Sequence, residues 1–235
     1  PDFQNPTGTT LPLEARRRLL ELAEGHGVPL VEIAIYRGLR YEGEDIPSLR
    51  ELDPGPSVIH IGSFSKIAFP GLRVGWVHAP RAVVERLAEA KQWCDLHTDH
   101  LSQYLLHEFA RSGALEAHRR QVLDAGRERL RAALDALGNC AGLERFTRPQ
   151  GGMSLWATLR GGLEAERVLE TLAGRVAFLP GSAFAVSRRH AQSFRLSFAG
   201  LRPAAIRRGI GILSEAARQA RAAGERYGAP HMAIV

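Results

Sequence analysis

Apolar residues recur along the chain in two spacings, one helical and one typical of strands. Apolar positions three and four residues apart predict helices over 13–26, 81–91, 101–111, 114–137, 164–173 and 203–223. Short apolar runs bounded by Gly, Pro or polar residues predict strands at 28–35, 58–61, 74–77, 143–147, 153–158, 176–179 and 193–198. In the first half these strands alternate with helices, and this order favours an α/β fold with a mainly parallel sheet.

The pattern changes after Ser112 and Gly113, where one long helix rich in Arg, Leu and Ala begins. The strands and helices that follow it have the order of an α+β domain. We therefore predict a larger domain over residues 1–125 and a smaller C-terminal domain over residues 126–235. A chain of 235 residues is long enough for two such domains, each with its own core.

Composition narrows the function classes. The hydrophobic content of 45% and the charged content of 24% are ordinary for a globular protein, and no apolar run reaches the roughly 20 residues that a membrane-spanning helix needs. The net charge of +6 comes mainly from arginines spread along helical segments, which predicts solvated helix faces rather than a nucleic-acid surface. The two cysteines, Cys94 and Cys140, are too few for a disulfide framework. We predict a cytoplasmic protein that contacts neither membrane nor nucleic acid.

Polar side chains of metal-binding types gather in one place, at Asp95, His97, Asp99 and His100. They fall between two predicted helices, in a stretch that also contains lysine, glutamine and threonine. We interpret the stretch as a helix connection near the rim of a site, and we predict no metal centre.

A single lysine, Lys66, stands between two serines and an arginine in the segment I-G-S-F-S-K-I-A-F-P-G-L-R at 61–73. A lysine amine is nucleophilic only when it is deprotonated, and a nearby cation such as Arg73 favours that form. Ser63, Ser65 and Arg73 offer hydroxyl and guanidinium donors that together suit a phosphate group. A lysine beside such donors suits a Schiff base to a phosphorylated aldehyde cofactor, although spacing alone also fits a plain surface loop.

Six segments match one known family, in the family's own order. They are N-P-T-G at 5–8, Tyr36 after a strand, S-F-S-K-I-A-F-P-G-L-R-V-G-W at 63–76, P-Q-G-G-M-S-L-W at 149–156, F-L-P-G-S-A-F at 178–184 and F-R-L-S-F at 194–198. Together they resemble the class I/II, fold-type I aminotransferases, which depend on pyridoxal 5'-phosphate. The resemblance implies that residues 1–125 are the remainder of the large cofactor-binding domain, and that the family's N-terminal portion is absent.

The resemblance also implies a role for each matching residue. Lys66 would form the Schiff base with the cofactor and then carry the proton during amino-group transfer. Asn5 and Tyr36 would hydrogen-bond the phenolate oxygen of the cofactor ring, so that Tyr36 acts with Lys66 in catalysis. Arg195 would pair with the α-carboxylate of the substrate, for which its planar guanidinium is suited. The cofactor phosphate would be held by Ser63, Ser65 and Arg73.

One position departs from the family. Members carry an aspartate three residues before the tyrosine, where it keeps the pyridine nitrogen of the cofactor protonated, but this chain has Ile33 there. Glu32 is adjacent, yet neighbouring side chains of a strand point to opposite faces, so only a β-bulge would bring it to the ring. We expect transamination to fall by several orders of magnitude if nothing compensates, each tenfold loss being about 1.4 kcal/mol of barrier.

The leading hypothesis is a homodimeric aminotransferase that moves an amino group between an L-amino acid and a 2-oxo acid. The segments Y-R-G-L-R-Y at 36–41 and P-G-L-R-V-G-W at 70–76 resemble the branch that acts on aminoadipate, aromatic and branched-chain amino acids. Two alternatives stay open. One is the effector-sensing domain of a MocR-type GntR transcription regulator, which binds the cofactor without needing turnover. The other is an inactive fragment, favoured by Ile33 and by the absent N-terminal portion.

Overall fold

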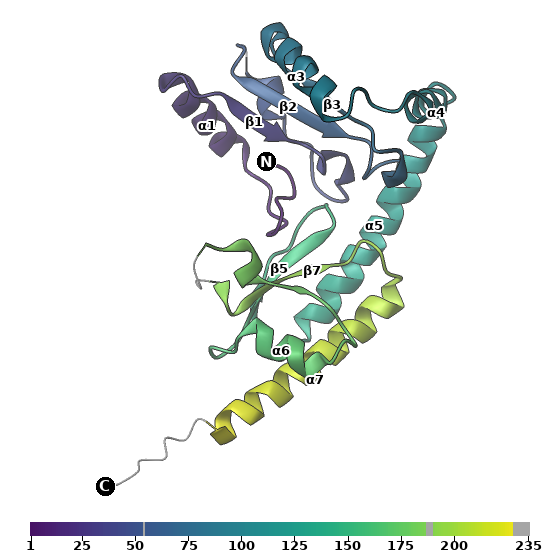
Figure 1. The fold of residues 1–235 in the computed structure, drawn as a ribbon. Helices are drawn as coiled ribbons and strands as arrows, with labels where there is room; N and C mark the ends of the chain where they lie inside the picture. The colour runs from purple at the N-terminus through teal and green to yellow at the C-terminus, as the bar shows by residue number, and fades with distance from the viewer. Residues whose placement is uncertain (54, 187–189, 228–235) are drawn as a thin grey trace. The chain divides into compact units, whose positions relative to one another are not determined.

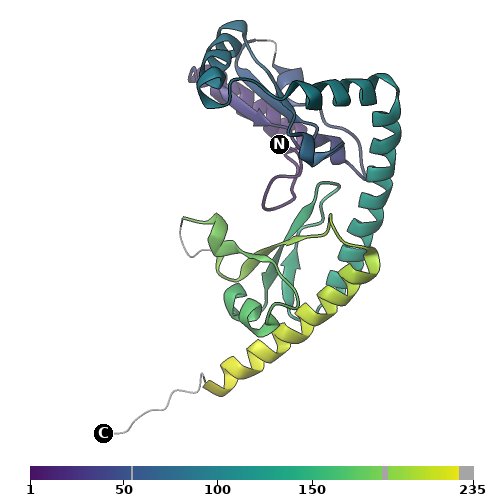
Figure 2. The ribbon, with the colours of Figure 1, turned by 45° about the vertical axis from the view of Figure 1, so that its right-hand side comes forward.

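The structure, a computed structural model, describes residues 1–53, 55–186 and 190–227. The chain folds into two compact units (Figures 1 and 2). The first unit consists of residues 1–4, 10–126 and 150–152, and the second of residues 5–9, 127–149 and the described residues from 153 onward. One long helix, α5 (Ala114–Gly138), contributes residues to both units. Each unit is therefore assembled from segments that lie far apart in the sequence.

The first unit is built on a three-stranded sheet. Its strands, in the order in which they pair, are β1 (Leu30–Ile33), β2 (Val58–Ser63) and β3 (Gly75–His78). β1 and β2 are parallel and β3 runs antiparallel to β2. The helices of this unit are the part of α5 up to Gly126, α1 (Leu13–Gly25), α2 (Leu49–Leu52), α3 (Arg81–Cys94) and α4 (His100–Arg111), with 3₁₀ helices η1 (Arg37–Leu39) and η2 (Pro70–Leu72).

The two faces of this sheet differ in burial. Side chains alternate along each strand, as pleating requires, so that Glu32 is 1% exposed whereas Val31 and Ile33 are 57% and 58% exposed. We call the buried side, against which α2 packs, the inner face; it carries Glu32, Val58, His60 and Gly62. We call the other side the open face; it carries Val31, Ile33, Ile59, Ile61 and Ser63.

The second unit has a four-stranded antiparallel sheet. Its strands pair in the order β4 (Leu143–Phe146), β5 (Ser154–Leu159), β7 (Ser193–Ser197), β6 (Leu179–Pro180). The helices α6 (Ala165–Leu172) and α7 (Pro203–Tyr227) pack against each other, and a 3₁₀ helix η3 spans Gly181–Phe184. Phe194 is fully buried, and its ring centroid lies 4.5 Å from that of Phe178. Burial of such large apolar side chains is the main stabilising contribution in this unit.

Most predicted helices and strands are present within a few residues of their expected bounds. The strand predicted at 176–179 is wrong in extent, because only Leu179 and the following Pro180 pair with β7. The helix α2 was not predicted, since a single turn is too short to show a helical repeat. Its start is fixed instead by Ser48, whose side chain and Glu51 form a capping box. No helix among the described residues combines the length and apolar character needed to cross a membrane.

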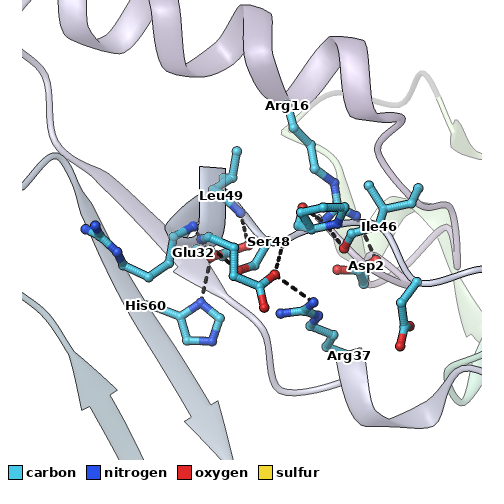
Figure 3. A network of polar contacts seen from close by, with 12 residues as sticks. Asp2, Arg16, Glu32, Arg37, Ile46, Ser48, Leu49 and His60 are labelled. Carbon is cyan, nitrogen blue, oxygen red and sulfur yellow. Dashed lines mark hydrogen bonds and ion pairs between the residues drawn. The ribbon is translucent and has the colours of Figure 1, made fainter. Parts of the chain in front are cut away.

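A buried ion pair fixes the N-terminal segment to α1 in the first unit (Figure 3). Arg16 is fully buried, and its Nη2 donates to Asp2 Oδ1 at 2.7 Å. Arg40 donates to the same oxygen at 3.1 Å. The Arg16 guanidinium also donates to the backbone oxygens of Leu11, Ile46 and Pro47. A buried charge is tolerated only when it is paired and hydrogen-bonded, so the fold of this region depends on these contacts to Asp2 Oδ1.

Replacing Arg16 by leucine should destabilise the protein by about 3–5 kcal/mol, because Asp2 loses its closest partner while remaining buried. Arg17→Leu is the matched control: Arg17 is the next residue of α1 and pairs with Glu14 on the surface, where ion pairs contribute about 0–1 kcal/mol. Chemical denaturation of both variants measures the difference. Equal losses in the two variants would contradict the assignment of Arg16 as a structural anchor.

Candidate functional site

Two parallel strands of the first unit end at the same edge of the sheet, and a residue singled out from the sequence follows each of them. β1 leads to Tyr36 and β2 leads to Lys66. The two side chains lie close together, with Lys66 Nζ 5.9 Å from the centroid of the Tyr36 ring. Ligands of parallel sheets bind outside the carboxyl ends of the strands, so this edge is where a ligand is expected.

The segment after β2 holds Lys66 in a tight turn. Ser65 donates its backbone N–H to Ser63 Oγ at 3.1 Å. The Ile67 side chain packs against the backbone of Gly38, where an added Cβ would lie 2.8 Å from an Ile67 methyl group. This close packing ties the turn to the segment that follows β1, while Lys66 itself is partly exposed.

An aromatic cluster anchors the other end of this turn. The ring centroid of Phe69 lies 5.1 Å from that of Phe109 in α4 and 5.4 Å from that of His118 in α5. Phe109 and His118 are themselves 5.9 Å apart, edge to face. Such pairs stabilise beyond the area that they bury. The lysine-bearing turn is thus held between β2 and two helices, an arrangement that sequence reasoning did not identify.

Arg73 ends the segment in a left-handed backbone conformation, with φ of 54°. A positive φ is uncommon for a residue other than glycine, and it is often found at functional sites. Its Nη1 donates to the backbone oxygen of Pro70 at 3.2 Å, and the side chain is otherwise exposed, which leaves donors of the guanidinium open to solvent. Arg73 is thus the third predicted phosphate ligand on the segment 63–73, after Ser63 and Ser65.

Only two lysines occur in the sequence, Lys66 and Lys91. Lys91 lies in α3, where its Nζ contacts both carboxylate oxygens of Asp95 at 2.7 and 2.8 Å. This ion pair engages the Lys91 amine with a carboxylate at the end of its own helix. Lys66 is therefore the side-chain amine best placed to form a covalent bond with a carbonyl group. This count was visible in the sequence and strengthens the prediction made for Lys66.

The second unit brings together Asn5 and Arg195, which are 190 residues apart in the sequence. Arg195 lies in β7 opposite Trp156 in β5, and its Nη1 donates to Asn5 Oδ1 at 2.8 Å. The guanidinium also lies 5.4 Å from the centroid of the Phe184 ring. Both side chains are at least partly exposed. A guanidinium oriented in this way by an amide and an aromatic ring suits a bidentate contact with a carboxylate.

The N-P-T-G turn that carries Asn5 is held against the second-unit sheet by two contacts. Thr147 Oγ1 donates to the backbone oxygen of Thr7 at 2.7 Å. Gly8 has φ of 72°, and a Cβ at this position would lie 2.6 Å from the backbone oxygen of Ser154. Both the positive φ and the close approach require glycine. The glycine of the N-P-T-G motif therefore allows the turn to pack closely against Ser154 of β5, and this packing places Asn5 beside β7.

Glu32 and Ile33 occupy opposite faces of the first-unit sheet, as the sequence predicted. Glu32 Oε1 accepts the N–H of Leu49 at 2.8 Å, and Oε2 accepts the N–H of Arg50 at 3.1 Å (Figure 3). His60 Nδ1 lies 2.6 Å from the same Oε2. Ile33 lies on the open face. The carboxylate next to Ile33 is thus fully engaged elsewhere.

The polar stretch after α3 has structural contacts of its own. Asp95 pairs with Lys91, and Asp99 accepts the N–H of Ser102 at the start of α4, a hydrogen bond that lowers the pKa of its carboxyl group. The rings of His97 and His100 stack with centroids 4.7 Å apart. Within the described part of the chain, no three or more His, Cys, Asp or Glu side chains converge as metal ligands.

Comparison with known proteins places this geometry in a family. Residues 3–213 match the family model for aminotransferase class I and II. The chain belongs to the class I and II aminotransferases. The family and the fold class expected from the sequence are thereby confirmed, since the structural neighbours are fold-type I aminotransferases.

The similar proteins carry names of two kinds, aminotransferases and transcriptional regulators. This chain is 42% identical to the 2-aminoadipate transaminase of Thermus thermophilus over 221 residues, which are 92% of this chain and 55% of that protein. The crystal structure of LysN, the α-aminoadipate aminotransferase of the same species, complexed with N-(5'-phosphopyridoxyl)-L-leucine, matches with a TM-score of 0.86 at 40% identity, covering 95% of this chain and 58% of that one. YisV, an uncharacterized HTH-type transcriptional regulator of Bacillus subtilis, is 32% identical over 93% of this chain and 45% of the regulator. The chain spans about half the length of the relatives that it matches.

Arg195→Gln should weaken the binding of pyruvate, a small 2-oxo acid, by about tenfold or more, because a charge-assisted hydrogen bond contributes about 1.5–3 kcal/mol. Arg145→Gln, at an exposed arginine of β4 in the same unit, is the matched control and should bind pyruvate as the unaltered chain does. A ligand-detected NMR titration measures both. Unchanged binding in Arg195→Gln would rule out Arg195 as the carboxylate ligand.

Proposed function

We propose that this chain is the Lys66-bearing part of a pyridoxal-phosphate-dependent aminotransferase, which moves an amino group between an L-amino acid and a 2-oxo acid. The observation that carries the proposal is the position of Lys66 beside Tyr36, at the carboxyl edge of two parallel strands. An amine, two hydroxyls and a guanidinium on one short segment are the groups needed to hold a phosphorylated aldehyde. Membership of the aminotransferase family supports the same interpretation.

Pyridoxal 5'-phosphate fits the residues present. When bound, it supplies an aldehyde for the amine and a ring that withdraws electrons. Ser63, Ser65 and Arg73 would bind its phosphate, and Tyr36 would orient the ring from the end of β1. Lys66 would bind the cofactor covalently, and its Nζ, once released by an incoming amino acid, would accept and return the substrate's α-proton. The pyridoxyl compound in the LysN complex supports this choice of cofactor.

Substrates of the proposed enzyme would carry an α-carboxylate. Arg195 would bind that group, and Asn5 would hold the guanidinium in place. The similarity to a 2-aminoadipate transaminase supports an amino acid as donor and a 2-oxo acid as acceptor.

In this proposal, residues 1–125 form the cofactor-binding domain and residues 126–235 the small domain. Both cysteines are free, which agrees with a cytoplasmic location.

A homodimer is part of the proposal. Apolar side chains gather where α3 ends and α4 begins, and Trp93 is 92% exposed there. We call this set the α3–α4 patch; it consists of Trp93, Leu96, Leu101, Tyr104 and Leu105. Exposed apolar groups of this extent, with two large aromatic rings, are typical of protein–protein interfaces. A second copy of this chain is the partner that the family's dimers suggest.

A second function is supported by the similarity to YisV, whose name describes a transcriptional regulator. A sensing domain needs to bind the cofactor and an amino acid, but it does not need turnover. Ile33 at the open face agrees with that role. The two functions differ in one measurable property: an enzyme exchanges amino groups in many turnovers, whereas a sensor binds the same ligands and releases them unchanged.

Titration of the purified chain with pyridoxal 5'-phosphate should give the shifted absorbance band of a Schiff base. Lys66→Ala should abolish this band, because it removes the reacting amine. Lys91→Ala is the control, since it removes the other lysine of the chain and should leave the band intact. A band that survives in Lys66→Ala, or no band in the unaltered chain, would refute the proposed cofactor site and favour an inactive fragment.

Trp93→Asp should raise the dimer dissociation constant roughly thirtyfold or more, because loss of an aromatic hot spot costs about 2 kcal/mol. Leu22→Asp in α1, at another exposed apolar position, should leave the dimer unchanged. Sedimentation equilibrium measures both constants. A chain that is monomeric at every concentration, or equal weakening by the two substitutions, would contradict the assigned interface.

A further inference from the structure

The open face of the first-unit sheet offers no charged group to a ligand bound at Lys66. Its side chains along β1 and β2 are aliphatic up to Ser63, and Val77 of β3 lies opposite Ile61. Glu32 is the only acidic residue in the three strands, all of which are described. A ring bound at the carboxyl edge of these strands therefore has aliphatic neighbours on this face at Ile33 and Ile61, whereas Val31 and Ile59 lie one pair of residues further from that edge.

Glu32 is held away from this face by its own contacts. It is 1% exposed on the inner face, where its carboxylate contacts the N–H groups of Leu49 and Arg50 and the imidazole of His60 (Figure 3). His60 is in turn stacked on Trp76, with ring centroids 5.1 Å apart. Turning Glu32 outward would break all three contacts and leave the N–H groups of Leu49 and Arg50, at the start of α2, without the carboxylate that accepts their hydrogen bonds.

The strand register gives no other route for Glu32 to reach the open face. A β-bulge in β1 would rotate the side chain, but β1 and β2 pair without interruption from Leu30 opposite Val58 to Ile33 opposite Ile61. The position opposite Glu32 on β2 is His60, its hydrogen-bond partner. The β-bulge that the sequence left open is therefore absent from β1.

Pyridoxal phosphate withdraws electrons strongly only when its pyridine nitrogen is protonated, and enzymes commonly supply an acidic residue as the partner of that nitrogen. An apolar surface disfavours the charged, protonated form. We infer that this chain binds the cofactor with its pyridine nitrogen unprotonated, because Ile33 provides no partner and Glu32 is fixed on the inner face. The inference rests on the proposed cofactor site at Lys66. It implies that an amino acid is bound readily but exchanges its amino group slowly.

The test uses the 235-residue chain loaded with pyridoxal 5'-phosphate labelled with ¹⁵N in the ring, because the nitrogen chemical shift reports protonation directly. The unaltered chain should show an unprotonated nitrogen at neutral pH, where a pyridine nitrogen that has a carboxylate partner is protonated. Ile33→Asp should give a protonated nitrogen under the same conditions. The same substitution should also raise any amino-transfer rate by about tenfold or more.

Two control variants test whether the nitrogen responds to a carboxylate at position 33 in particular, or to a change of charge anywhere on this strand. Val31→Asp adds the same charge on the same strand and face, at a position 57% exposed against 58% for Ile33, and should leave the nitrogen unprotonated. Glu32→Gln should also leave it unprotonated, while reducing the stability of the fold. The protonation of the nitrogen and the binding of the cofactor through Lys66 are separate readouts, so failure of the inference can be told from failure of the proposed function. A protonated nitrogen in the unaltered, Lys66-dependent complex overturns this inference alone, whereas a chain that binds no cofactor through Lys66 overturns the proposed function and the inference with it.

Discussion

The parallel pairing of β1 with β2 is the constraint on which the rest of the first unit depends. Because the strands run in the same direction, their carboxyl ends meet at one edge, and Tyr36 and Lys66 come together there. The same register sends Glu32 to the inner face and Ile33 to the open face. A slip of one residue would exchange the two faces, placing a carboxylate on the open face at the proposed ligand edge and an isoleucine against α2. One pairing therefore sets both the position of the site and the polarity of its surroundings.

Buried charge on the inner side explains why this register is strongly specified. The Glu32 carboxylate is satisfied only where the N–H groups at the start of α2 and the ring of His60 can reach it. The same short helix is fixed from outside by Glu51, which accepts the N–H of Ser48. A hydrogen bond from Arg37 lowers the pKa of the Glu51 carboxyl group, so that the capping residue stays ionised. An alternative register would leave these buried carboxylate contacts unmade.

The chemistry proposed for this aminotransferase family member depends on anion recognition at two places. In the first unit, Ser63, Ser65 and Arg73 are suited to a phosphate beside the reactive amine. In the second unit, the guanidinium of Arg195 is oriented by Asn5 and is suited to a carboxylate. An enzyme and a sensor of amino acids require the same two anion sites. What separates them is turnover, and in the inference drawn above Ile33 lowers turnover through the electronic state of the cofactor ring, without affecting either anion site.

The sequence by itself determined the family and the departure at Ile33, and it predicted the reactive lysine and its phosphate donors. These features are local, since each is a short motif or a single residue type at a fixed spacing, and the long helices follow from periodicity in the same way. The tertiary structure decided what spacing cannot express. The contact between Asn5 and Arg195 joins residues 190 positions apart, and the aromatic anchor of the lysine turn at Phe69 draws on two helices. The position of Glu32 likewise depends on α2, a helix of four residues that is too short to leave a periodic signal. The first N–H groups of this helix donate to the carboxylate and hold it on the inner face.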